Sequence, residues 1–174
     1  MAIDDLKGAL KDYAKDQRLN LGRVFDGAGL TPQQTWGTAV ACAIAVRNPR
    51  VRDAILAEAA PHLSAEAMDA ARGAAVVMGM NNIYYRFTHM VGDDDYTTMP
   101  AGLRMNIIGR PGVDKVDFEL WCLAVSAING CESCVRSHEK VVRDGGVSRE
   151  GVQSAVKIAA VLHAVATAVE AEPA

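Results

Sequence analysis

Polar capping residues stand directly before the long apolar stretches of this sequence. The placement of these residues constrains the fold more than any other feature. Thr31-Pro32-Gln33-Gln34 combines a capping residue, a proline at the first helical position and a glutamine three residues after the cap. Asn48-Pro49 repeats the cap and the proline, and Ser64, Asp114 and Ser148 precede further runs with apolar residues every three or four positions. We therefore expect an all-α fold.

The spacing of apolar residues sets the expected helix bounds. We expect an amphipathic helix in the first 16 residues and further helices over residues 31–46, 49–60, 65–85, 114–128, 131–144 and 149–169, the one at 49–60 being short. Residues 91–113 are rich in glycine, proline and aspartate, so we expect a loop-rich connection with a short helix near residues 103–107. The acidic triplet at 93–95 is expected to be a solvated loop, because no ligand follows at the spacing of a calcium loop.

The order of these elements repeats, which predicts an internal duplication. The sequence after Ser64 matches that after Ser148, and Trp36 aligns with Trp121 at nearly the same offset. Only 5% of the residues are aromatic, so close helix packing must build the core from small apolar side chains. We expect residues 1–174 to form one all-helical domain with pseudo-repeat halves at 31–90 and 114–170, because three helices alone bury too little surface.

Charge and hydropathy exclude several classes of protein. The net charge is −3, and a binder of nucleic acid or of an anionic membrane needs a basic surface. The apolar stretch over residues 31–46, which contains no charged residue, has 16 residues and falls short of the ~18 apolar residues that a membrane-spanning helix requires. We expect a soluble, cytoplasmic protein with neither a nucleic-acid nor a membrane partner.

The cysteines are the residues with the most evident chemistry. Cys42 and Cys122 lie in apolar helical runs and are expected to be buried and inert. Cys131 and Cys134 are three residues apart at a predicted helix start, where they are close enough for a disulfide and the helix dipole favours a thiolate. His138 follows Cys134 by four residues, on the same helix face, and can act as a base.

Other kinds of cysteine site have sequence requirements that this chain meets only in part. A structural zinc site needs two more ligands at a recognisable spacing, and the sequence has no second close pair. A c-type haem requires histidine directly after the second cysteine, where this chain has Val135, and a thioredoxin fold requires a βαβ unit. Thiol redox chemistry, a zinc site and an inert reduced pair remain open on spacing alone.

Glu119 and three other histidines complete the set of candidates. By itself, Glu119 is typical of a solvated carboxylate in the first turn of a helix. His163 lies in an apolar run and is expected to be a core residue, whereas His62 and His89 lie near helix ends and are expected at the surface.

Two segments together resemble a known family. Phe118-Glu119-Leu120-Trp121 and Ile128-Asn129-Gly130-Cys131-x-x-Cys134-x-x-x-His138-Glu139 are similar to the alkylhydroperoxidase D (AhpD) family of the carboxymuconolactone decarboxylase-like superfamily. The resemblance covers nearly the whole chain, including the duplicated helical layout. A glutamate twelve residues before such a motif is much more specific than two cysteines alone.

The resemblance implies an antioxidant thiol peroxidase, a lipoyl-dependent alkyl hydroperoxide reductase with no bound cofactor or metal. Such an enzyme takes electrons from dihydrolipoyl groups of a 2-oxoacid dehydrogenase complex and reduces the peroxiredoxin alkylhydroperoxide reductase C. It also implies a homotrimer. The alternatives are a disulfide-exchange adaptor with incidental peroxidase activity and a metal-binding or structural helical module, while a lactone decarboxylase has no evident need of the cysteine motif.

The resemblance also assigns roles to the site residues. Cys134 becomes the sulfenic acid, His138 accepts its proton, and Glu119 holds the imidazole tautomer. Cys131, expected to be the more exposed, exchanges with the donor and the partner. The helix dipole alone would select Cys131 as the more acidic thiol, but the base and its carboxylate favour Cys134. Some family members have histidine immediately before the second cysteine, where this chain has Ser133, so that imidazole has no counterpart here.

Overall fold

The computed structural model describes residues 2–172 as helices joined by short connections, with no β-strand in that range. The α-helices are α1 (Ala2–Ala9), α2 (Lys15–Leu21), α3 (Pro32–Ala45), α4 (Pro49–Ala59), α5 (Ala65–Val91), α6 (Asp94–Thr98), α7 (Asn106–Gly109), α8 (Lys115–Ile128), α9 (Glu132–Asp144) and α10 (Arg149–Glu170). Two 3-10 turns, η1 (Asp12–Ala14) and η2 (Val24–Asp26), lie near the N-terminus. The all-α prediction is therefore confirmed.

Each capping residue identified in the sequence begins a helix. Thr31 and Gln34 form a complete capping box, in which the Gln34 N–H donates to Thr31 Oγ1 at 3.2 Å and the Thr31 N–H donates to Gln34 Oε1 at 3.0 Å. Side-chain oxygens of Asn48, Asp114 and Ser148 likewise accept from the first turns of α4, α8 and α10, and Ser64 caps α5 in the same way. Side chains thus satisfy N–H groups that the helix itself leaves unpaired.

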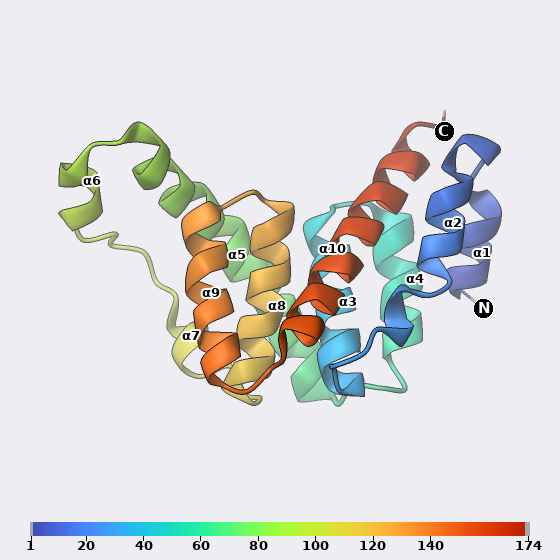
Figure 1. Ribbon diagram of the computed structural model, residues 1–174, viewed down its shortest axis with the longest axis horizontal. Coiled ribbons are helices and arrows are strands. Elements are labelled where there is room, and N and C mark those ends of the chain that lie inside the picture. Colours follow the sequence, from blue (N-terminus) through green and yellow to red (C-terminus); the bar gives the residue numbers. More distant parts are fainter. Residues whose placement is uncertain (1, 173–174) are drawn as a thin grey trace.

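Four long helices, α3, α5, α8 and α10, form the centre of the molecule, with α9 beside α8 and α4 beside α3 (Figure 1). Trp121 and Phe118 of α8 are among its largest fully buried side chains. Gly37 permits the approach of α3 to α8, since a β-carbon there would stand 2.2 Å from the Trp121 ring. Small residues thus let the helices that carry the site pack closely.

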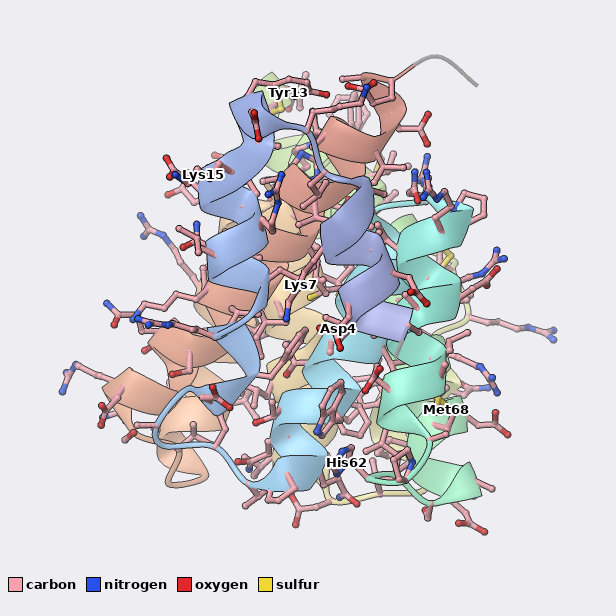
Figure 2. The ribbon with its side chains drawn as sticks, turned by 90° about the vertical axis from the view of Figure 1, so that its right-hand side faces the viewer. Asp4, Lys7, Tyr13, Lys15, His62 and Met68 are labelled. Carbon is pink, nitrogen blue, oxygen red and sulfur yellow. A yellow bond between two sulfur atoms is a disulfide. The ribbon has the colours of Figure 1, made fainter. Side chains whose placement is uncertain are left out.

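The expected N-terminal helix is wrong, because the segment breaks in two. Figure 2 shows α1 and α2 as separate helices, with Tyr13 at the end where one passes into the other. The guanidinium of Arg18 donates to the Leu10 carbonyl at the break. Since α1 packs on α4 whereas α2 packs on α10, a straight helix would not bury both apolar faces.

The α5 helix is longer than expected and ends outside the body of the molecule. It runs to Val91 rather than to residue 85, and stops at Gly92 in a left-handed conformation (φ +69°). The acidic triplet is not a plain loop, because Asp93 accepts the Asp95 N–H at 3.0 Å and begins α6. Figure 1 shows the end of α5 and α6 projecting away from the other helices, and the short α7 begins at 106, later than expected.

The helix order agrees with a duplicated layout, since α3, α4 and α5 have 14, 11 and 27 residues and α8, α9 and α10 have 14, 13 and 22. The duplication itself stays a prediction. By length and composition, α10 is long and apolar enough to cross a membrane, although Lys157 interrupts its apolar sequence. This is weak evidence, because the core helix of a soluble protein passes the same test, and α10 packs on α8 and α3.

Candidate active site

The two closely spaced cysteines stand at the start of α9 and are joined by a disulfide. Cys131 is the N-cap residue of α9 and Cys134 lies in its first turn, with their Cα atoms 5.3 Å apart. The N–H groups of this turn have no partner within the helix and place positive potential beside both sulfur atoms. The local fold therefore brings the pair together and favours sulfur in its anionic form when the bond is opened.

The turn between α8 and α9 is held from two sides. Gly130 takes a left-handed conformation (φ +66°), and the Cys131 N–H donates to the Ser126 carbonyl at 3.1 Å. From α5, Arg86 donates to the Asn129 carbonyl at 2.5 Å. These bonds fold the turn back on α8, which explains why the first cysteine is not at the surface.

The expected exposure of Cys131 is therefore wrong. Cys131 is 0% exposed and Cys134 is 7% exposed, so the second cysteine is the more accessible of the two. A position at the start of a helix suggested exposure, but the turn buries the N-cap residue. The Cys131 sulfur lies 3.7 Å from the Ser133 hydroxyl.

Glu119 and His138 form a buried pair that links α8 to α9. The carboxylate Oε2 lies 2.5 Å from His138 Nδ1, and the two residues are 4% and 9% exposed. The pair excludes the interpretation of Glu119 as a solvated carboxylate. An ionised carboxylate only accepts hydrogen bonds, so it fixes Nδ1 as the protonated nitrogen and leaves Nε2 to exchange a proton.

Met78 of α5 faces the other side of the imidazole. Its sulfur lies 3.3 Å from His138 Nε2 and 3.4 Å from the Ser126 hydroxyl, and the residue is fully buried. Glu119 thus contacts one edge of the ring, and a polarisable thioether packs against the other. The sequence placed Met78 in the apolar stripe of α5 and carried no signal of this contact.

A cavity of about 320 Å³ opens beside these residues. Cys134, His138 and Glu119 line it, which places a sulfur and an imidazole around one space. Its other walls come from α5, α7, α9 and the segment before α7, and are formed by Met78, Asn81, Tyr85, Met105, Ile108, Ser133, Ser137 and Val141. The cavity is therefore mainly apolar with a few polar groups, as is common for sites that bind small molecules.

The two remaining cysteines are unsuited to thiol chemistry. Cys42 and Cys122 are fully buried and unpaired. Burial raises the pKa of the Cys42 thiol, and burial together with the nearby Glu119 carboxylate raises the pKa of the Cys122 thiol well above its usual value. Both side chains therefore stay protonated at neutral pH.

The other candidates lie away from this cavity. His62 and His89 are exposed as expected, but His163 is also exposed, so its assignment to the core is wrong. It lies on the outward face of α10, which the apolar run around it concealed. Within residues 2–172, no group of three or more His, Cys, Asp or Glu side chains is arranged to hold a metal ion.

Comparison with known proteins gives a consistent family. Residues 94–174 match the model of the Carboxymuconolactone decarboxylase family. Over 172 residues the chain is 57% identical to the alkyl hydroperoxide reductase AhpD of Streptomyces avermitilis, covering 99% of this chain and 97% of the relative. It is 61% identical over 170 residues to the protein of the same name from Gluconacetobacter diazotrophicus, covering 98% and 93%. With Rhodospirillum centenum AhpD it shares 56% over 174 residues, covering 100% and 94%. The chain therefore belongs to the AhpD family.

Proposed function

We propose that this protein is an alkyl hydroperoxide reductase that works through its Cys131–Cys134 pair. The observation that carries the proposal is the cavity in which Cys134 and the buried Glu119–His138 pair meet. The names of the relatives, alkyl hydroperoxide reductase, agree with this chemistry.

The first step needs a thiolate on Cys134. A free thiol has a pKa near ~8.5, so only a small fraction is ionised at neutral pH without help. His138 Nε2 accepts the thiol proton, and Glu119 stabilises the resulting imidazolium through Nδ1. The first turn of α9 adds a favourable potential at the sulfur.

The second step transfers oxygen. The Cys134 thiolate attacks the terminal oxygen of the hydroperoxide, the O–O bond breaks, and the leaving alkoxide takes a proton from His138. The products are an alcohol and a sulfenic acid on Cys134. Attack by the Cys131 thiol then expels water and forms the disulfide, and a dithiol reductant restores both thiols by exchange.

The electron donor, the partners and the assembly are also part of the proposal. We infer that dihydrolipoyl groups of a 2-oxoacid dehydrogenase complex supply electrons in the cytoplasm, and that the reduced pair in turn reduces alkylhydroperoxide reductase C. No bound cofactor is required by this scheme. A homotrimer is supported by the exposed apolar side chains Ile83, Phe87, Met90 and Tyr96 on α5 and α6, which a second copy would cover.

Peroxide consumption with dihydrolipoamide tests the function directly. The purified chain should consume cumene hydroperoxide, and Cys134→Ser should abolish this, whereas Cys42→Ala should retain it. Adding alkylhydroperoxide reductase C measures how much turnover depends on that partner. If the unsubstituted chain consumes peroxide no faster than Cys134→Ser, the proposed peroxidase activity is wrong. Activity found only with the partner would favour a disulfide-exchange adaptor.

A further inference from the structure

Asn81 lines the cavity, has no role in the scheme above, and carries a buried oxygen without a hydrogen-bond partner among the described residues. Asn81 of α5 is 4% exposed and lines the cavity together with Cys134 and His138. Its Oδ1 is fully buried and has no hydrogen-bond partner among the described residues. Buried polar atoms of this kind are rare in folded proteins, because removing them from water without a partner is unfavourable.

The unpartnered atom does not depend on how the amide is turned. In the present orientation Asn81 Nδ2 faces the Met105 sulfur at 3.7 Å, a weak contact. Exchanging the oxygen and the amino group would leave the amino group in the same vacant position, without an acceptor. In either orientation, one hydrogen-bonding group of this cavity-lining side chain stays unused within the described residues.

The neighbouring residue, Asn82, differs from Asn81 because its amide forms hydrogen bonds within the protein. Asn82 donates to the Ser126 hydroxyl at 2.9 Å and accepts from the Asn129 amide at 2.9 Å. A second cavity, of about 790 Å³, also contains a buried polar group, the Asp117 carboxylate. Both of its oxygens have partners, because Gln33 and Gln34 donate to them at 2.7 and 2.8 Å. Asn81 is distinguished by its lack of such partners.

We propose that Asn81 binds the hydroperoxide by accepting a hydrogen bond from its terminal O–H group at Oδ1. The inference rests on the proposed function. A hydroperoxide has one donor, on the oxygen that the thiolate attacks, and Asn81, a residue that lines the cavity, has an unused acceptor in Oδ1. The bond fixes the terminal oxygen while the alkyl group lies against Met105 and Ile108, which line the same cavity.

This bond survives the reaction. When the Cys134 thiolate forms the S–O bond and the O–O bond breaks, the terminal oxygen keeps its hydrogen, and the alkoxide receives its proton from His138. The hydrogen that Asn81 accepts therefore becomes that of the sulfenic acid. Asn81 contacts the reacting oxygen before and after transfer, and takes no part in the later exchange with a dithiol.

The test separates the oxidation of the protein from its reduction. Asn81→Leu removes the amide at similar volume, and Asn81→Ala, which a tight core tolerates more easily, serves if the leucine variant does not fold. The first measurement is the rate constant for oxidation of the reduced chain by cumene hydroperoxide in a single turnover. The second is the rate constant for reduction of the disulfide by dihydrolipoamide. The control is Asn82→Ala, which removes an amide whose bonds are all within the protein.

We expect the oxidation rate constant of the Asn81 variants to fall about tenfold, the effect of one lost hydrogen bond, with the reduction rate constant unchanged. Asn82→Ala should lower the melting temperature and keep the ratio of the two constants. Unchanged oxidation in the Asn81 variants, or an equal fall in both constants, would overturn the assignment. Failure of the unsubstituted chain to react with peroxide would instead reject the proposed function.

Discussion

Replacing Glu119 by glutamine is the sharpest test of the proton relay, because it changes charge and leaves shape nearly unchanged. The carboxylate lies 2.5 Å from His138 Nδ1 and is 4% exposed, so water cannot substitute for it. Glutamine lacks the negative charge that stabilises the imidazolium, and its amino group can also donate to Nδ1, which moves the ring proton to Nε2. In that tautomer Nε2 has no lone pair with which to accept the Cys134 proton.

The expected loss follows from what this tautomer removes. General acid–base catalysis by a positioned side chain contributes ~10²–10⁴-fold, so Glu119→Gln should slow peroxide turnover by ~10²-fold or more. His138→Ala removes the same proton transfer and should cost a similar factor. Because both changes disable one unit, the double variant should be little slower than either single one.

The assay is single-turnover oxidation of the reduced chain by cumene hydroperoxide. The control is Glu139→Gln, the same substitution on the residue next to His138. The Glu139 side chain is 45% exposed and lies 3.9 Å from Arg143, so this variant should keep full activity. Unchanged oxidation rates in Glu119→Gln and His138→Ala would show that these residues do not transfer the Cys134 proton. Losses that multiply in the double variant would show that the two residues act separately.

The remaining predictions concern the cysteines and the assembly. After mild peroxide treatment, peptide mapping should find Cys131 and Cys134 in one disulfide and the other two cysteines as free thiols; a disulfide to Cys42 would contradict the site. In Cys131→Ser a sulfenic acid should be trapped on Cys134, and labelling of Cys131 in Cys134→Ser alone would reverse the roles. Burial raises the pKa of Cys42 and Cys122 above the usual value of 9.0, so above that pH only the unfolded state releases these protons. The free energy of unfolding that the two buried thiols contribute is therefore fully present below pH 9.0. Above it, this free energy falls by about 1.4 kcal/mol per thiol for each pH unit. Urea unfolding between about pH 8 and 10 measures this slope, which Cys42→Ala should reduce and which a flat profile would disprove. Light scattering should find more than one chain per particle, and a monomer of 18.5 kDa would reject the oligomer.

The sequence was most informative where the physical cause is local. A capping residue interacts with the residue three positions later, within one helical turn. The starts of α3, α4 and α5 could therefore be predicted from Thr31, Asn48 and Ser64. The three-residue spacing of Cys131 and Cys134 likewise restricts their distance before any tertiary structure forms. The family resemblance, rather than spacing, drew attention to Glu119.

The sequence was least informative where distant segments meet. Met78 and Asn81 look like ordinary positions of an apolar helix, and only the packing of α5 against α8 and α9 brings them to the cavity. The burial of Cys131 depends on how the turn folds over α8. His163 gave the opposite error, because an apolar run does not reveal which side of its helix faces outward.

The long helix α5 connects the cavity beside the cysteines with the exposed apolar end of the molecule. Its 27 residues extend about 40 Å as a single rod. Near its middle the rod carries Met78 and Asn81, further along it Arg86 holds the carbonyl of Asn129, and His89 lies 3.5 Å from Glu132 at the start of α9. The same end presents the apolar side chains that a second copy would cover. In the proposed oligomer, a displacement of this end of α5 would be transmitted through Arg86 and His89 to the turn that carries the cysteines. We therefore expect specific activity to fall when dilution separates associated copies.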